Sequence, residues 1–145
     1  MALYFNGNSP DAVVYNGNNC DKVVYNGVTV WEAWKSWSDS ASTYKEGYPE
    51  PPMYATVTTG SNIRVTYATA VGHKAYVEGE YGKIRIEAYY NGSWHELAIS
   101  DDGFSECSCS WSGDLVCEQI RAHYEYNLAR YEGCSINVGG LKKGS

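Results

Sequence analysis

The chain has 145 residues and a formal net charge of −6, and it is rich in tyrosine (14), glycine (15) and tryptophan (5). This length has room for one ordinary domain and a small appendage, and the composition favours β structure with many turns. The net charge is negative and the longest basic run is Lys142-Lys143, and both features argue against nucleic-acid binding. No apolar run approaches the roughly twenty residues of a membrane span, and the first residues lack the features of a signal peptide. We therefore expect a product made in the cytoplasm without a membrane partner.

A ten-residue phrase occurs three times near the start of the chain, at residues 3–12, 13–22 and 23–32. Internal repeats are among the strongest signals that a sequence can carry. Each copy places β-forming residues before Asn-Gly, a pair that readily adopts the positive φ angles of a tight hairpin turn. Residues 1–34 are therefore predicted to form a module of short β-hairpins.

The third copy has a β-prone return arm, so its register can be predicted. With a two-residue turn at Asn26-Gly27, Tyr25 lies opposite Val28 and Val23 lies opposite Val30. Apolar side chains then occupy both faces of a very small sheet. Such a sheet is only marginally stable by itself, because it buries too little surface. We therefore predict that the hairpin module docks on another protein. The residues assigned to docking are Tyr15, Tyr25, Val28, Val30 and Trp31.

The tandem Tyr-Asn-Gly copies, which end in VVYNGVTVWE at residues 23–32, resemble segments that open small structural proteins of tailed bacteriophages and related prophages. The resemblance covers about the first quarter of the chain. It implies a component of the virion, made in the host cytoplasm, whose partners are other virion proteins. Homo-oligomerisation follows because positions in a virion are repeated. A tail, baseplate or fibre position is preferred to capsid decoration.

Residues 35–54 are predicted to be a connector rich in serine and proline. They contain a serine-rich patch at residues 36–42 and the sequence YPEPP at residues 48–52. Proline cannot continue a β-ladder or a helix, so this stretch is interpreted as extended. The domain boundary is placed here, and Trp34 and Trp37 are expected to pack over an open end of the next domain.

Residues 55–145 are predicted to form a β-sandwich of about seven strands without a helix. Alternation of apolar and polar residues identifies the inward-facing positions. These positions are Ile63, Val65 and Tyr67; Ile84, Ile86 and Ala88; Cys107, Cys109 and Trp111; Ile120, Ala122, Tyr124 and Tyr126; and Cys134, Ile136 and Val138. A further short strand is expected at residues 75–77, with turns at residues 101–103 and 112–114. An immunoglobulin-like or fibronectin-like sandwich is the first choice of fold, and a jelly roll is the second.

The clearest register in the chain lies across the turn at Asn91-Gly92. Pairing Tyr90 with Ser93 places Ile86 opposite Leu97 on the inner face. Turn chemistry and the apolar pattern agree on this alignment. The same register places two pairs on the outer face, which are Tyr89 with Trp94 and Glu87 with Glu96.

The outer face of this hairpin is the candidate ligand or partner surface. It carries Tyr89, Trp94, Glu87, Glu96 and Arg85. Aromatic rings stack on sugars or on apolar partner surfaces, and carboxylates accept hydrogen bonds from sugar hydroxyls. A host surface glycan or receptor is the ligand class that this surface suggests. The structural alternatives are an aromatic pair that pins the hairpin, or a face covered by the hairpin module.

No catalytic residue is assigned, because the chain has no Gly-x-Ser-x-Gly, P-loop or His-Glu-x-x-His signature. Four cysteines and His123 could in principle bind zinc, but cysteines at alternating strand positions behave as small buried apolar residues, and Cys-x-x-Cys knuckles are missing. Neither a metal nor another cofactor is predicted. Whether Cys107, Cys109, Cys117 and Cys134 are free or disulfide-bonded stays open.

The leading hypothesis is therefore a non-enzymatic virion structural protein that docks through its hairpin module and displays a β-sandwich. The second is a module that binds a carbohydrate or host receptor through Tyr89 and Trp94. The third is a soluble effector that binds a host protein.

Overall fold

The structure is a computed structural model that describes residues 10, 12–47, 49–74, 82–101, 106–126 and 131–143. Its elements are β-strands, and within these ranges no helix has the length and apolar character needed to cross a membrane. The strands are β1 (Val14–Tyr15), β2 (Asn18–Asn19), β3 (Lys22–Tyr25), β4 (Val28–Glu32), β5 (Trp34–Glu46), β6 (Met53–Thr58), β7 (Ile63–Lys74), β8 (Gly82–Tyr90), β9 (Ser93–Ile99), β10 (Glu106–Leu115), β11 (Gln119–Tyr126) and β12 (Tyr131–Lys143).

The second and third copies of the repeat form the hairpins β1–β2 and β3–β4, as predicted. Asn16 and Gly17 have φ angles of 50° and 78°, and the Asn26-Gly27 turn has 51° and 76°. Two successive positive φ angles define the type I′ turn that Asn-Gly favours in hairpins. The first copy, at residues 3–12, lies almost wholly outside the described residues.

The register of the β3–β4 hairpin agrees with the prediction only next to its turn. Tyr25 pairs with Val28 as expected, but the register shifts between Val23 and Val24. Val23 therefore lies opposite Trp31 instead of Val30. A bulge inserts one extra residue into one strand, and alternation alone does not reveal where it occurs.

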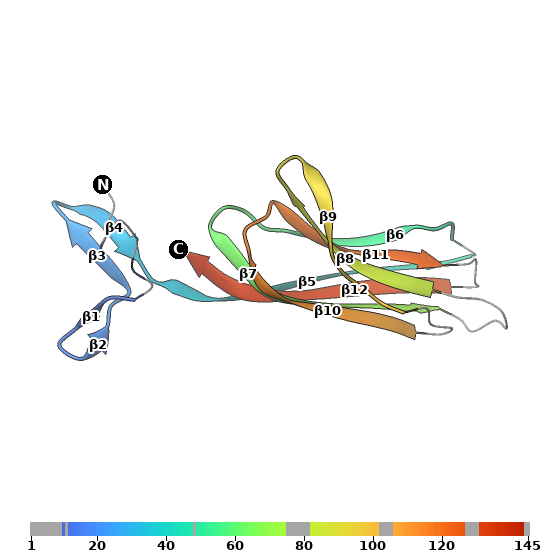
Figure 1. The fold of residues 1–145 in the computed structure, drawn as a ribbon, viewed down its shortest axis with the longest axis horizontal. Coiled ribbons are helices and arrows are strands. Elements are labelled where there is room, and N and C mark those ends of the chain that lie inside the picture. The colour runs from blue at the N-terminus through green and yellow to red at the C-terminus, as the bar shows by residue number, and fades with distance from the viewer. Residues whose placement is uncertain are drawn as a thin grey trace.

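The predicted β-sandwich is confirmed (Figure 1). Its first sheet has the order β10-β7-β12-β5, and its second sheet has the order β6-β11-β8-β9. Apart from the β8–β9 hairpin, every connection from β5 to β12 crosses from one sheet to the other. This winding of eight strands is that of a jelly roll, the second choice of topology, and not that of an immunoglobulin-like sandwich.

The eighth strand is β5, which lies in the segment predicted to be a connector. It pairs with β12 along its whole length, from Trp34 opposite Lys143 to Glu46 opposite Tyr131. Residues 35–46 therefore belong to the sandwich, and the connection to β6 is limited to residues 47–52. The prediction is wrong here because serine is a weak β-former, whereas the pairing depends on a strand almost a hundred residues away. Trp37 packs against the core.

The core between the two sheets contains most of the residues that were predicted to face inward. All three predicted positions of β8, all four of β11 and all three of β12 are buried. Tyr67 is the exception, because its side chain is 49% exposed. The register of β7 against β12 shifts between Gly139 and Gly140, which turns Ala68 and Ala70 inward in its place.

Two further predicted details differ from the structure. Ile86 pairs with Ala98 instead of Leu97, because the β8–β9 register shifts between Ile86 and Glu87. The turn predicted at residues 112–114 is an irregularity within β10, between Ser112 and Leu115. The strand predicted at residues 75–77 and most of the turn at residues 101–103 lie outside the described residues.

The ring of Tyr124 fills the core at positions where two strands have no side chain. A Cβ atom at Gly72 would lie 2.5 Å from Tyr124 Cδ1, and one at Gly82 would lie 2.6 Å from its hydroxyl oxygen. Real Cβ atoms do not approach other atoms so closely. Glycine is therefore required at both positions by packing.

We expect Gly72→Ala to lower the free energy of unfolding by about 1–3 kcal/mol, the usual cost of overpacking a core. Urea denaturation measures the change. Gly60→Ala is the matched control, because its Cβ would lie 3.4 Å from Asn62 Oδ1, an ordinary contact. Equal stability of the two variants would contradict the packing argument.

Candidate functional site

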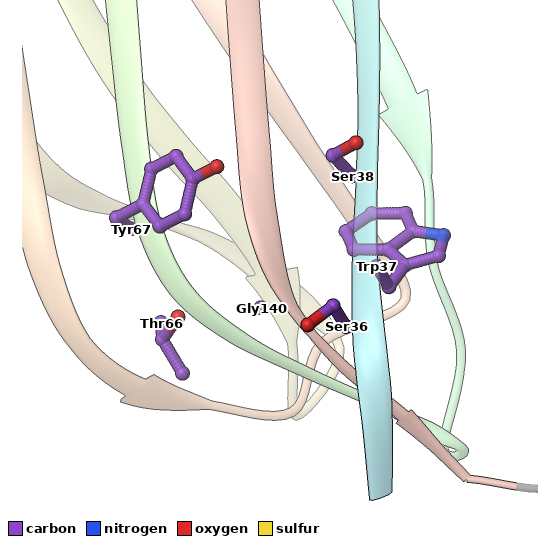
Figure 2. A pocket seen from close by; sticks show the side chains of 6 residues that line it. All are labelled: Ser36, Trp37, Ser38, Thr66, Tyr67 and Gly140. Carbon is purple, nitrogen blue, oxygen red and sulfur yellow. The ribbon is translucent and has the colours of Figure 1, made fainter.

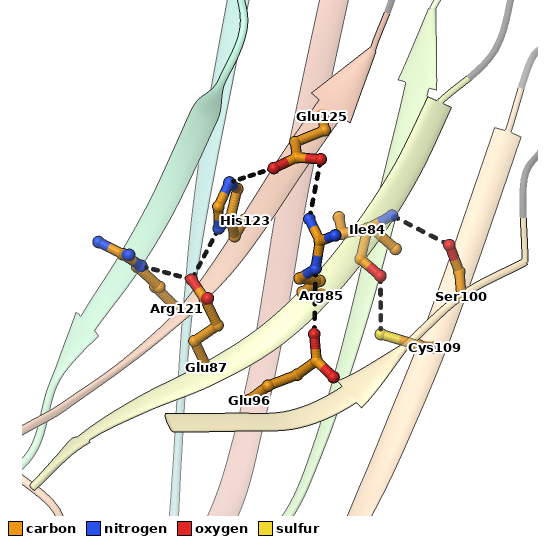
Figure 3. A network of polar contacts seen from close by, with 9 residues as sticks. All are labelled: Ile84, Arg85, Glu87, Glu96, Ser100, Cys109, Arg121, His123 and Glu125. Carbon is orange, nitrogen blue, oxygen red and sulfur yellow. Dashed lines mark hydrogen bonds and ion pairs between the residues drawn. The ribbon is translucent and has the colours of Figure 1, made fainter. Parts of the chain in front are cut away.

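The outer face of the second sheet, called here the charged face, brings together all five residues of the predicted ligand surface. Tyr89 pairs with Trp94 and Glu87 pairs with Glu96, as the register predicts. The two aromatic rings meet edge to face, with centroids 5.3 Å apart. Arg85 lies further along β8 on the same face (Figure 3).

Arg85 joins the edge strand of this sheet to its centre. Its Nε lies 3.0 Å from Glu96 Oε1 on β9, and its Nη1 lies 3.0 Å from Glu125 Oε2 on β11. The interaction with Glu125 is the main reason that the pKa of Arg85 is raised above its ordinary value, with a smaller contribution from Glu96. The guanidinium is therefore held in its charged form by two carboxylates.

Glu87 is the centre of a second group of contacts (Figure 3). Its Oε1 lies 3.0 Å from Arg121 Nε and 2.8 Å from His123 Nδ1, and its side chain is only 14% exposed. His123 Nε2 lies 3.3 Å from Glu125 Oε1, which connects this group to that of Arg85. Six ionisable side chains from β8, β9 and β11 therefore form one continuous chain of contacts.

This chain of contacts removes the like-charge repulsion expected between Glu87 and Glu96. Glu87 is paired with Arg121 and Glu96 is paired with Arg85, so each carboxylate has its own cation. Opposite charges on neighbouring strands contribute favourably, whereas unpaired like charges would destabilise the sheet. The two glutamates can therefore stay directly opposite one another.

The guanidinium of Arg121 lies between two aromatic rings. Its Cζ is 3.7 Å from the centroid of Trp94 and 4.1 Å from that of Tyr54 on β6. Both distances fall within the range of a cation–π contact. One face of the Trp94 ring, which was predicted to stack on a ligand, is therefore covered by a side chain of the protein itself.

Four residues of the charged face were not predicted. They are Tyr54, Arg121, His123 and Glu125. The last three alternate with buried residues of β11, so their outward direction was visible in the sequence. Their neighbours were not, because β11 pairs with β6 and β8 over long sequence separations.

The docking residues predicted in the hairpin module divide into two groups. Tyr15, Tyr25 and Val28 are exposed, as docking requires, but Val30 and Trp31 are buried. Trp31 Nε1 donates a 2.7 Å hydrogen bond to the carbonyl oxygen of Pro10. Trp31 therefore helps to hold the module together and does not present its ring to a partner.

None of the cysteines that were considered as zinc ligands or disulfide partners forms a disulfide bond. Cys107 and Cys134 both pair with Gly72 from strands on either side of it. Two strand spacings separate their Cα atoms by roughly 10 Å, beyond the limit of about 7 Å for a disulfide. Across the described ranges, no three histidine, cysteine or acidic side chains are grouped so as to hold a metal ion.

Burial is the main cause of the raised pKa values of these thiols. The pKa of Cys109 is raised to about 11 and that of Cys134 to about 12. Burial also raises the pKa of Tyr126, to about 12. These groups are neutral at pH 7, so the thiols have little of the thiolate character that metal binding or nucleophilic attack requires.

We expect the free energy of unfolding to fall as the pH rises from about 9 to about 12. In this window the unfolded chain loses protons from thiols and phenols that the folded protein keeps, so the unfolded state is favoured. Urea unfolding at pH 8 and pH 10.5 measures the effect. Cys109→Ala removes one of the groups and should show a smaller fall, whereas stability that is unchanged or higher at pH 10.5 would refute the assignment.

No protein-family model matches the chain, and no curated protein matches it either. Among solved structures, the chain is similar to the N-terminal CBM22-1–GH10 modules of endo-1,4-β-D-xylanase 10B from Clostridium thermocellum, complexed with xylohexaose. The identity is 14% and the TM-score is 0.35, over 77% of this chain and 26% of that one. The chain thus corresponds to about a quarter of the xylanase chain, and a likeness of this size does not indicate a function.

Proposed function

We propose that the chain is a non-enzymatic virion structural protein of a tailed phage, which docks through its hairpin module and displays the jelly roll. A position in the tail, baseplate or fibre is preferred to capsid decoration. The exposure of large apolar side chains on the hairpins is the observation that carries the proposal. These side chains are Val14 (60% exposed), Tyr15 (73%), Val24 (50%), Tyr25 (56%) and Val28 (52%).

The geometry of the hairpins explains why these side chains need a partner. Each hairpin is a two-stranded sheet, and neither edge is paired with another described strand. A sheet of this size cannot cover its own apolar side chains, and its free edges offer hydrogen bonds to an added strand. A virion protein that covers these hairpins would remove the apolar side chains from water and complete the edges.

The resemblance of the Tyr-Asn-Gly copies to the opening segments of phage structural proteins supports a virion as the place of docking. Equivalent positions recur in a virion, so the same hairpins would be used many times with the same geometry. Homo-oligomers and contacts with other virion proteins are both consistent with this arrangement. The host cytoplasm would be the site of synthesis.

We expect the purified chain to assemble and the triple variant Tyr15→Ser, Tyr25→Ser, Val28→Ser to have the mass of a monomer, because the substitutions remove the apolar contact. Light scattering measures the native mass. Val116→Ser is the control, since Val116 is a similarly exposed apolar residue, 47% exposed, on the sandwich. A monomeric wild-type chain, or a triple variant with unchanged mass, would contradict assembly through the hairpins.

The second candidate function is recognition of a host receptor by the charged face. The observation in its favour is that Tyr54, Tyr89 and Trp94 share one face with two arginines and three glutamates. Aromatic rings beside charges of both signs suit a polar, charged partner better than a neutral one.

We expect Trp94→Ala to weaken binding of the chain to a receptor glycan at least about tenfold, because the indole is the largest aromatic group on this face. An array that includes anionic glycans identifies the ligand, and titration gives the affinity of each variant. Val116→Ser is again the control. Unchanged affinity in Trp94→Ala, with an intact fold, would eliminate this face as the receptor site.

A further inference from the structure

The outer face of the first sheet, called here the serine face, has a very different surface from the charged face. Serines occupy its two edge strands at every second position. They are Ser38, Ser40 and Ser42 on β5, and Ser108, Ser110 and Ser112 on β10. All six are exposed.

The registers of the four strands show what lies between these serines. A row across the middle of the sheet runs from Ser110 through Thr69 and Asn137 to Ser40, and all four residues are exposed. The neighbouring rows place Val71 and Ser135 on one side of this row, and Tyr67 and Gly139 on the other. Seven of the twelve residues in the three rows are therefore serines.

None of these twelve residues is charged. At the 19% of charged residues that the whole chain contains, twelve residues would carry about two charges. The chain as a whole has a net charge of −6, and the opposite sheet carries a dense network of ion pairs. The lack of charge is therefore a property of these three rows and not of the composition.

Tyrosine rings lie at both ends of the serine face, over glycines of β12. A Cβ atom at Gly139 would lie 2.1 Å from Tyr67 Cζ, and one at Gly133 would lie 3.4 Å from Tyr44 Cδ2. Tyr67 is 49% exposed and Tyr44 is 56% exposed. The two glycines are six residues apart on one strand, so the rings bracket a flat strip about 20 Å long.

An open hollow of about 290 Å³ lies beside Tyr67, at one end of this strip (Figure 2). Its lining residues are Ser36, Trp37, Ser38, Thr66, Tyr67 and Gly140. Figure 2 shows Tyr67 extending from β7 toward β12 and β5, with its hydroxyl directed along this path. The volume is near the lower end of the range for small-ligand sites, which suits one sugar ring.

We propose that the serine face binds an extended, uncharged polysaccharide, and that the hollow beside Tyr67 holds one of its sugar units. Serine, threonine and asparagine side chains donate and accept hydrogen bonds, which matches the hydroxyls of a sugar chain. Tyrosine rings provide flat apolar surfaces for the faces of sugar rings. The twelve residues give an acidic polysaccharide no cation with which to pair, and Arg64, further along β7, is paired with Asp114 on β10.

The composition of this face also argues against a protein partner. Serine is depleted at protein–protein interfaces, because it buries little apolar surface. The proposal concerns the sheet opposite the charged face, so it is independent of both functions proposed above.

Affinity electrophoresis of the full chain in gels containing dextran, laminarin, xyloglucan or galactomannan tests the proposal, with heparin and polygalacturonate as charged comparators. We expect at least one neutral polysaccharide to retard the wild-type protein. Tyr67→Ala should weaken this binding about tenfold, because it removes the ring that would stack on the bound sugar. Thr69→Lys should have a similar effect, because its charged side chain stands in the middle of the strip.

Val116→Ser is the matched control and should bind as the wild type does, because Val116 is exposed on the sandwich but lies outside the three rows. Unfolding midpoints show which variants keep the fold, and Ser40→Lys, at another exposed position, replaces any variant that does not. The proposal is overturned if no neutral polysaccharide retards the wild-type chain. It is equally overturned if Tyr67→Ala and Thr69→Lys keep the fold and bind as the wild type does.

Discussion

The pairing of β12 with β5 on one side and with β7 on the other is the constraint on which the rest of the structure depends. β12 supplies Cys134, Ile136 and Val138 to the core through one face. Its other face carries the glycines on which Tyr67, His73 and Tyr44 lie. Because β5 continues directly from β4 after a single residue, the same pairing also fixes where the hairpin module leaves the sandwich. Core, outer surface and attachment of the module therefore all depend on one strand.

The two outer faces of the sandwich carry different kinds of polar side chain. On the charged face, the glutamates are paired with arginines, and Arg121 covers one side of the Trp94 ring. Many of the groups that could contact a ligand here therefore already contact other residues of the protein. Buried or half-buried ion pairs of this kind hold side chains in place more than they add stability. On the serine face, the hydroxyls of the two edge strands stay exposed to solvent. An incoming neutral ligand would thus have fewer protein contacts to replace on the serine face.

The alternation of residues in the sequence predicted the direction of most side chains, but it could not predict how the strands pair. Ile84, Ile86 and Ile120 were assigned to the core correctly, because period-2 alternation is a local property. The Asn91-Gly92 turn likewise predicted the pairing of Tyr89 with Trp94, which contributes half of the charged face. The other half comes from β11 and β6, whose partners lie far away in sequence. The same limit accounts for the missed strand β5 and for the incorrect first choice of topology. The smaller errors, in strand register and in the direction of a side chain, each occur at a bulge, where one extra residue breaks the alternation.

The hairpin module and the sandwich differ in how they are held together, and this difference bears on how the chain would work. The sandwich buries a continuous core that extends over both sheets, whereas the described part of the module buries little beyond Val30 and Trp31. Figure 1 shows the hairpins beyond one end of the sandwich, so they cover neither of its outer faces. Of the two structural alternatives for the Tyr89 and Trp94 surface, coverage by the hairpin module is therefore not what the structure has. A module with so little core would gain order from the surface on which it docks, because docking would bury the apolar side chains that the hairpins leave exposed. Docking at that end would leave both outer faces free to meet a ligand.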